Sequence, residues 1–483
     1  MKVIYLMADT FRRDHLGVYG NKWVHTPNLD QLAAGAAVFD RAYIGSFPTV
    51  PNRRDTLLGR GDQGVPFNRW KVIEPNEVTL PQRLGEKKIP SMLITDTQNN
   101  VTRGLNLFKG YTAWYLNRGQ EADPYWLDEN VPLRYPVPRH LIRYTAGVWH
   151  QVLINRAHRR VETDWFAPGT YSKAIEWLER NYRRDDFFLW VDTFDPHEPW
   201  DPPQHYIDLY DPGYEGRVFE APTYGLRKKL GITDRELKHI RARYAAEVTM
   251  VDTWIGEFLR TLERLGIFEE TLIIFTSDHG TMFDYPGENG RLQKPTTVGA
   301  DGMCMSAGRP MKEPVRDFPI AESVARIPLI IKLPRMRRGK RVSHIVQPWD
   351  LTATILGAFG IRKPAGLIGQ SLLPMVRGKG KRIRDAAIVG TNHLAQAMNA
   401  RWRFSMWRTG KKPMLTDLRN DPSAGRNVLA KNEGVAKRLY RQIVRFMEGM
   451  GMDQEYIRGY TLNPEGSKPR SNWFGELYPL GDE

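Results

Sequence analysis

The chain has 483 residues, 41% of them hydrophobic, and carries a formal net charge of +15. This length predicts one large α/β domain with an appended subdomain, and the hydrophobic content excludes global disorder. The only cysteine, Cys304, excludes an intrachain disulfide and a cysteine zinc cluster. The positive charge indicates either an anionic partner or a solvated basic surface. Both interpretations stay open, because the basic residues are scattered along the chain.

The first apolar segment runs from Lys2 to Ala8 and ends at Asp9. It is too short for most signal peptides, so it predicts a strand buried on both faces of a parallel sheet. No stretch approaches the ~18 uninterrupted apolar residues of a spanning helix. We therefore expect a cytoplasmic protein without a membrane span.

The following segments predict alternating helices and strands. Thr26 and Pro27 are typical of a helix start, whereas Ser46–Pro51 predicts a loop and residues 110–168 an irregular insertion. Gly- and Pro-rich residues 281–320 predict a long loop. We expect helices at 54–58, 171–182, 234–265 and 351–359, and strands at 90–95, 187–194, 271–277, 327–333 and 342–346.

The composition changes near residue 380, after a basic run. A strand at 386–389, a hairpin of 402–407 with 414–418, a final helix at 436–447 and a Pro/Gly-rich tail follow. We predict a catalytic α/β domain at 1–379, with a large mixed, mostly parallel sheet flanked by helices. Residues 380–483 form a small C-terminal α+β subdomain with an extended tail.

Chemically active side chains lie where the predicted strands end. Asp9 follows the first strand, Asp278 and His279 follow another, and Thr49 lies in the proline-rich loop four residues before Arg53. Open α/β sheets bind ligands at the carboxyl ends of their strands. An acid, a hydroxyl and an Asp-His pair at such an edge indicate a metal-activated nucleophile. His197, held between prolines after another strand, is a further candidate.

Several motifs resemble the sulfatase branch of the alkaline phosphatase superfamily. T-P-N-L-D-Q-L-A, F-D-R-A-Y and the proline-arginine loop ending in L-L-G-R resemble its N-terminal block. D-P-H-E-P-W and T-L-I-I-F-T-S-D-H-G resemble its histidine segment and Asp-His metal block. E-S-V-A-R-I-P-L-I, D-L-T-A-T-I-L, G-Q-S-L-L-P and T-D-L-R-N-D-P follow in the family's order. Nearly the whole chain takes part in this resemblance.

The nucleophile segment departs from the family pattern. Sulfatases carry Cys-x-Pro-Ser-Arg, whose cysteine becomes formylglycine, whereas this chain has T-V-P-N-R with Thr49 at that position. Threonine cannot become formylglycine. The superfamily's members with a threonine nucleophile, such as its phosphodiesterases, act on phosphorus. A threonyl ester must be hydrolysed at its central atom, so the resemblance implies a phosphodiester or phosphonate monoester substrate and a phospho-threonine intermediate.

The first strand shows a second departure. Sulfatases carry two adjacent acids there, but Thr10 follows Asp9 in this chain. The predicted ligands of one divalent metal ion are Asp9, Thr49, Asp278 and His279. Mn, Fe or Zn is favoured over Ca, because imidazole suits these metals and calcium prefers more oxygens. The resemblance also extends to phosphonate monoester hydrolases, although these retain the formylglycine cysteine.

The remaining site residues are assigned by chemistry. Arg53 is predicted to hold Thr49 and bind equatorial oxygens through its planar fork. His197 is the first choice to assist the leaving oxygen and Lys294 the second, with Lys312 as the alternative to Lys294. Thr97 and Asn99, on another strand-end loop, are candidate substrate-binding residues. Whether a second metal binds at Asp201 and His205 stays open.

Competing functions remain. The sequence is also compatible with a sulfuric ester hydrolase without formylglycine, with a phosphoglycerol-type transferase, and with a non-catalytic polyanion-binding protein. The expected partner is a small anionic ester. No specific nucleic acid is predicted, and a homo-oligomer is compatible with the sequence.

Overall fold

The computed structural model describes residues 1–460 except 63–64, 103, 295–304, 307–308, 311–318, 392–393, 409–411 and 423. Cys304, Lys312 and the predicted C-terminal tail lie outside the described residues. In the part of the chain that is described, no helix is both long and apolar enough to cross a bilayer.

The centre of the molecule is a large mixed sheet. Nine described strands pair in the order β12-β2-β13-β7-β1-β5-β3-β4, with β14 beside β2. Most of its pairs are parallel, and β13 and β12 supply the antiparallel ones. The strands are β1 (Lys2–Ala8), β2 (Ala37–Tyr43), β3 (Ser91–Thr95), β4 (Ala113–Leu116), β5 (Phe187–Thr193), β7 (Thr271–Ser277), β12 (Arg326–Ile327), β13 (Leu329–Lys332) and β14 (Lys340–Val346).

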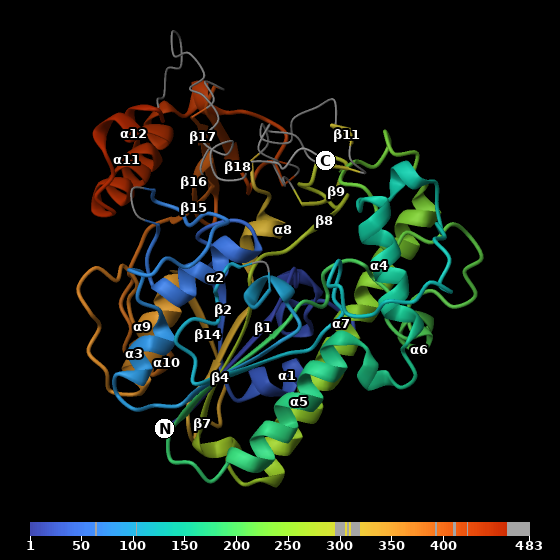
Figure 1. Cartoon of the computed structure of the whole chain (residues 1–483). Helices are drawn as coiled ribbons and strands as arrows, with labels where there is room; N and C mark the ends of the chain where they lie inside the picture. The colour runs from blue at the N-terminus through green and yellow to red at the C-terminus, as the bar shows by residue number, and fades with distance from the viewer. Residues whose placement is uncertain are drawn as a thin grey trace.

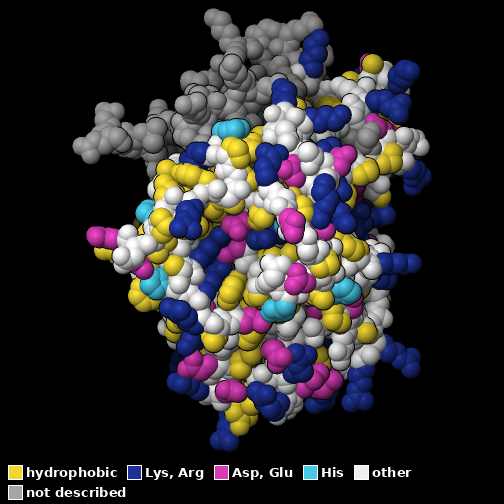
Figure 2. All heavy atoms as spheres, turned by 90° about the vertical axis from the view of Figure 1, so that its right-hand side faces the viewer, with side chains coloured by type: hydrophobic (Ala, Val, Ile, Leu, Met, Phe, Trp, Pro, Cys, Tyr) yellow, Lys and Arg dark blue, Asp and Glu magenta, His cyan; other side chains and the backbone are white. Residues whose placement is uncertain are grey.

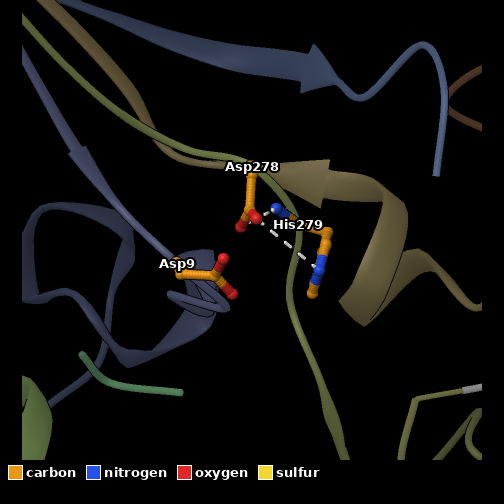
Figure 3. A group of neighbouring side chains, drawn as sticks. All are labelled: Asp9, Asp278 and His279. Carbon is orange, nitrogen blue, oxygen red and sulfur yellow. Dashed lines mark hydrogen bonds and ion pairs between the residues drawn. The ribbon is translucent and has the colours of Figure 1, made fainter. Parts of the chain in front are cut away.

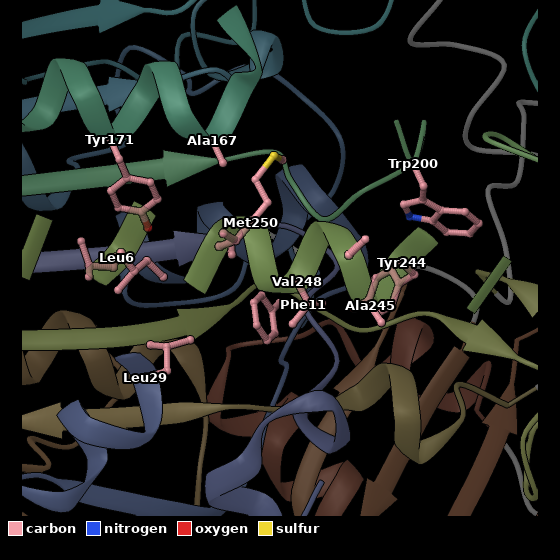
Figure 4. Close-up of a cluster of buried hydrophobic side chains, with 14 of the residues drawn as sticks. Leu6, Phe11, Leu29, Ala167, Tyr171, Trp200, Tyr244, Ala245, Val248 and Met250 are labelled. Carbon is pink, nitrogen blue, oxygen red and sulfur yellow. The ribbon is translucent and has the colours of Figure 1, made fainter. Parts of the chain in front are cut away.

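Helices cover both faces of this sheet (Figure 1). Strand β1 is buried along its whole length. Since the side chains of a strand alternate between its two faces, those of β1 enter two separate cores. The long helix α7 packs over one face, where Tyr244, Val248 and Met250 lie near Leu6 and Phe11 (Figure 4). The described helices are α1 (Pro27–Ala34), α2 (Thr49–Leu58), α3 (Leu80–Gly85), α4 (Ala146–Ala157), α5 (Phe166–Asn181), α6 (Gln204–Asp208), α7 (Asp234–Arg264), α8 (Glu322–Ala325), α9 (Pro348–Ala358), α10 (Leu373–Val376), α11 (Glu433–Gly449) and α12 (Gln454–Arg458).

A small antiparallel sheet forms the C-terminal subdomain. Its strands, in spatial order, are β15 (Ala387–Gly390), β16 (Leu394–Met398), β17 (Trp402–Trp407) and β18 (Met414–Asp417). The amphipathic helix α11 packs against this sheet and closes a third core. Short strands form two further small sheets. One has the order β6-β9-β8, with β6 (Gly225–Leu226), β8 (Met282–Phe283) and β9 (Arg291–Gln293), and the other pairs β10 (Met305–Ser306) with β11 (Arg309–Pro310). The fold class is therefore confirmed, whereas the boundary at residue 379 stays a prediction.

Four local predictions were wrong, and strand β16 was missed. One of the four is the predicted loop at 281–320, which contains β8, β9, β10 and β11. The predicted loop at Thr49 is the first turn of α2, because a proline at Pro51 is tolerated where backbone N–H groups have no helical partner. The 110–168 insertion contains β4 and α4, and Thr145 caps α4 by accepting from the Val148 N–H. Strand β16 pairs with β15 and β17 but was not predicted, and α12 follows the helix expected to be last.

Candidate active site

Asp9, Asp278 and His279 meet at the carboxyl end of the sheet. The paired strands β1 and β7 are parallel and in register from Lys2 with Thr271 to Ala8 with Ser277, so the residues that follow them emerge together. One ligand atom from each side chain lies within 4.8 Å of the other two. Figure 3 shows both carboxylates and the imidazole directed toward a common space.

The donor set fits a divalent metal ion. His279 Nδ1 lies 2.9 Å from the Gly280 carbonyl oxygen, which leaves Nε2 as the free lone pair. Burial and the nearby Lys294 lower the pKa of His279 to about 3, so the ring is neutral as a ligand must be. Burial and the charge of Asp278 raise the pKa of Asp9. Two buried acids facing each other are costly without cations, and Arg53 is one cation that contacts both of them.

Thr10 orients both carboxylates. Its N–H donates to Asp278 Oδ1 at 2.9 Å and its hydroxyl donates to Asp9 Oδ1 at 2.6 Å. These contacts require a φ of 61° at Thr10, which is rare and strained for a β-branched residue. The threonine that replaces an acid in the family pattern thus supports the two acids that remain.

Thr49 begins α2 and faces the same space. Its Oγ1 lies 3.4 Å from His279 Nε2, and its side chain is only 3% exposed. The positive end of a helix dipole stabilises negative charge at this position. The structure therefore places Thr49 beside the three-residue metal group, as the motif spacing predicted.

Arg53, one helical turn after Thr49, contacts three acids. Its Nη1 donates to Asp278 Oδ2 at 2.7 Å, to Asp9 Oδ2 at 3.1 Å and to the Thr49 carbonyl oxygen at 3.2 Å. The Nε and Nη2 edge binds both oxygens of Asp192. Since that edge is occupied, Arg53 cannot offer it to a substrate as predicted. It holds Thr49 and the acids in place instead.

His197 and Lys294 lie near the same group. Both are buried, and both act electrostatically on Asp9. His197 Nδ1 lies 2.6 Å from the Glu198 carbonyl oxygen. Burial and the charge of Lys294 hold the pKa of His197 well below its usual value. A neutral His197 suits a hydrogen-bond acceptor at Nε2 better than the proton donor that the sequence predicted.

The predicted substrate-binding residues have unequal environments. Thr97 is fully buried, and its hydroxyl lies 3.5 Å from Asp192 Oδ1, so it supports the Arg53 partner. Asn99 is also buried, and its Oδ1 has no partner among the described residues. Neither residue has a demonstrated substrate contact, and both assignments stay predictions.

Asp201 and His205 do not form a second metal site. Asp201 pairs with Arg156 and Arg159 at 2.7 and 2.5 Å. His205 is 62% exposed and lies 3.7 Å from Glu162. Within the described ranges, the cluster of Asp9, Asp278 and His279 is the only group of three or more acidic, histidine or cysteine side chains placed to hold a metal ion.

Sequence reasoning missed three supporting residues. Asp192 is the one acid inside the apolar strand β5. Because a buried acid is costly without a partner, its position could have indicated a buried ion pair. Asn100 donates to Asp192 Oδ2 at 2.7 Å. Asn52, one turn from Thr49, is 1% exposed, and both of its amide atoms lack partners in the described part of the chain. No sequence pattern marked Asn52 beyond its difference from the family serine.

A buried acid-imidazole group beside a hydroxyl at a helix N-terminus could hold a metal ion next to a nucleophile. The sulfatase family model matches residues 2–361, and a second model, described as the C-terminal part of N-sulphoglucosamine sulphohydrolase, matches residues 318–449. The chain therefore belongs to the sulfatase family and is an ester hydrolase of that family.

The relatives are distant but nearly full-length. An arylsulfatase of Clostridium perfringens is 23% identical and aligns over 95% of this chain and 96% of its own. Human arylsulfatase K is 26% identical over 89% of this chain and 79% of its own length. The phosphonate monoester hydrolase of Agrobacterium radiobacter superposes with a TM-score of 0.70 at 19% identity, covering 93% of this chain and 96% of that one. These levels of identity support the shared fold.

Proposed function

We propose that this chain is a metal-dependent hydrolase that uses Thr49 as a nucleophile on phosphorus esters, either a phosphodiester or a phosphonate monoester. The observation that carries the proposal is the 3.4 Å separation of Thr49 Oγ1 from His279 Nε2, inside a buried group with two acids. A hydroxyl held there, at the first turn of a helix, is placed for activation.

The metal ligands are Asp9, Asp278, His279 and Thr49. A bound divalent ion would lower the pKa of the Thr49 hydroxyl and polarise a phosphoryl oxygen. Mn, Fe or Zn suits this set better than Ca, because one ligand is an imidazole and Thr10 supplies no carboxylate. Thr10 and Arg53 keep the two acids in their positions.

In the chemical step, Thr49 gives its hydroxyl proton to solvent and attacks phosphorus in line. The Oγ–P bond forms while the bond from phosphorus to the leaving oxygen breaks, giving a phospho-threonine intermediate. Lys294 offsets the charge on the leaving oxygen. Water then attacks phosphorus while the neutral His197 accepts a proton from the water. The Oγ–P bond breaks, and this proton passes on to the released Thr49 oxygen.

Charge balance supports a monoanionic substrate. One metal ion and Lys294 complement the single negative charge of a phosphodiester or phosphonate, whereas a monoester dianion favours two metals. The fold similarity to two phosphonate monoester hydrolases, from Agrobacterium radiobacter and Silicibacter pomeroyi, is compatible with this choice.

Sulfate ester hydrolysis without formylglycine is the second candidate. It is favoured by the names of the curated relatives, which include arylsulfatases and an N-acetylglucosamine-6-O-sulfatase. A non-catalytic polyanion-binding role is less favoured. Figure 2 shows Lys and Arg side chains scattered among Asp and Glu on the face it presents, without one continuous basic field there.

A substrate panel tests the proposal. The panel compares kcat/KM for four p-nitrophenyl substrates: a phosphodiester, a phosphonate monoester, a phosphomonoester and a sulfate ester. Each is measured with Mn, Zn or Ca added. We expect the phosphodiester or phosphonate to be preferred and Thr49→Ala to abolish its turnover. A clear preference for sulfate would select the second candidate.

A further inference from the structure

A cavity with several charged side chains in its lining lies between the catalytic domain and the C-terminal subdomain. Its volume is about 450 Å³, within the usual size of small-molecule sites. Its walls come from the segment after β1, the β8–β9 turn, α8 with β12, and β17 with the residues after β18. In Figure 1, α8 lies between β8 and the small sheet. None of the proposed catalytic residues lines this cavity.

Four arginines line the cavity, and three of them have partners. Arg12 pairs with Glu288 at 2.6 Å and with Asp14. Arg326 pairs with Glu322 at 2.8 Å. Arg13 stacks on Tyr19, with its guanidinium carbon 3.9 Å from the ring centre.

Arg403 is the exception. It lies on β17, is 2% exposed, and makes no ion pair within the described residues. Its Nη2 is 3.5 Å from the Ala424 carbonyl oxygen, and its Nε has no partner in the described part of the chain. Burial lowers the pKa of Arg403 to about 10, and the attraction of Glu322 and Asp421 offsets only part of this effect. A buried guanidinium without a direct ion pair is costly, and a bound anion would offset that cost.

A second unpartnered group faces the same cavity. Ser323 Oγ is buried and lacks a hydrogen-bond partner among the described residues. A hydroxyl and the planar fork of an arginine together match the oxygens of a carboxylate, phosphate or sulfate group. A bare inorganic ion would leave much of a 450 Å³ cavity empty, which favours an organic anion.

We propose that this cavity is a binding site for a small organic anion, whose carboxylate, phosphate or sulfate group is held by Arg403 and Ser323. The site is separate from the metal group and does not depend on the proposed function. It nevertheless adjoins the active site, because a Cβ at Gly280 would lie 2.0 Å from the Ser323 carbonyl oxygen. Gly280 in turn accepts the hydrogen bond from the ring of His279.

Anion binding to the full chain tests this site. Citrate, phenyl phosphate and phenyl sulfate are titrated by calorimetry and by thermal unfolding into wild type, Arg403→Met, Ser323→Ala and the control Arg382→Met. Arg382 is exposed and pairs with Asp385 on the surface. At least one anion should bind Arg403→Met about tenfold more weakly than wild type, since losing a hydrogen bond to a charged group costs that much. Arg382→Met should match wild type.

The same experiment separates a ligand site from a structural arginine. Without anions, Arg403→Met should unfold at or above the wild-type temperature, because a buried charge without a direct ion pair has been removed. Equal anion binding by wild type and Arg403→Met would overturn the proposal, as would an anion-independent loss of stability. If Arg403→Met does not fold, two other experiments test the site: anion binding by Ser323→Ala, and electron density in crystals soaked in selenate. Weaker binding by Ser323→Ala or selenate density at Arg403 supports the site, and the absence of both overturns it.

Discussion

Arg53 and Asp192 form a two-point ion pair beneath the active site. Arg53 Nε donates to Asp192 Oδ2 at 2.8 Å, and Nη2 donates to Oδ1 at 2.7 Å. Both side chains are 1% exposed. Because this pair fixes the plane of the guanidinium, Nη1 is directed toward Asp9 and Asp278. The orientation of the proposed metal ligands therefore depends on a residue outside the proposed metal group.

Replacing Asp192 with asparagine should disturb this arrangement. We expect Asp192→Asn to lower kcat/KM by about 10–100-fold, as other outer-shell changes at metal sites do. The free energy of unfolding should fall by about 3 kcal/mol, because a buried charge loses its partner. Urea unfolding and steady-state kinetics measure the two effects. Asp385→Asn, which breaks an exposed pair with Arg382, is the control and should change neither. Wild-type kinetics in Asp192→Asn would show that Arg53 is held without it.

Loss of the Thr49 hydroxyl should remove turnover. We expect Thr49→Ala to lower kcat by about 10⁴-fold or more, whereas Thr49→Ser retains a measurable rate because it keeps the nucleophile. Thr56 is the other threonine of α2 and is also buried, so Thr56→Ala is a matched control that should stay active. Substantial activity in Thr49→Ala would indicate that another group or a water molecule attacks the ester.

Removal of the metal should affect both stability and activity. Chelation with EDTA should abolish turnover and lower the free energy of unfolding by about 3 kcal/mol relative to protein in metal at 100 times its Kd. Mn or Zn should restore activity better than Ca. Asp278→Asn should hold less metal by elemental analysis, and EDTA should then barely shift its unfolding. Full activity after exhaustive chelation would contradict the metal-dependent proposal.

The stability of the fold should fall as the pH rises from about 4 to 7, because of Asp55. Burial raises the pKa of this carboxyl to about 7, although it accepts hydrogen bonds from Ser46 and Asn68. Below its unfolded pKa of about 3.9, both states are protonated and the full stability is present. Between the two values only the unfolded state ionises, so unfolding becomes easier by about 1.4 kcal/mol per pH unit. Above the folded pKa the loss is complete.

Asp55→Asn isolates this effect. The variant lacks the titration, so the stability difference between wild type and variant should decrease steadily from pH 4 to 7 and then level off. Urea titrations at half-unit pH intervals measure it. A difference that does not change with pH would mean that Asp55 titrates normally in the folded protein.

The candidate site residues at the strand ends could be predicted from the sequence, because each one directly follows its strand along the chain. Asp9, Asp278 and His279 follow uninterrupted apolar strands, and parallel pairing necessarily brings the ends of β1 and β7 together. These residues could therefore be grouped as candidate metal ligands from the strand pattern together with the family resemblance. The hairpin of β17 and β18 was likewise predicted by alternation within a short segment.

The side-chain partners could not be predicted in the same way. Arg53 can reach many atoms, and its choice of Asp192 depends on how α2 packs over the sheet. The pKa depression of His197, which changes its expected role, arises from burial and from Lys294, far along the chain. The start of α2 was missed because Pro48 and Pro51 suggested a loop, although prolines are compatible with a first helical turn.

The most direct test of the central claim is mass spectrometry of enzyme quenched during turnover of bis(p-nitrophenyl) phosphate. Tryptic cleavage after Arg41 and Arg53 yields a peptide, 42–53, that contains Thr49. We predict a p-nitrophenyl phosphoryl adduct on Thr49 of this peptide, present in wild type and absent in Thr49→Ala. Turnover that proceeds with no adduct on Thr49, or with an adduct on another residue, would contradict the account.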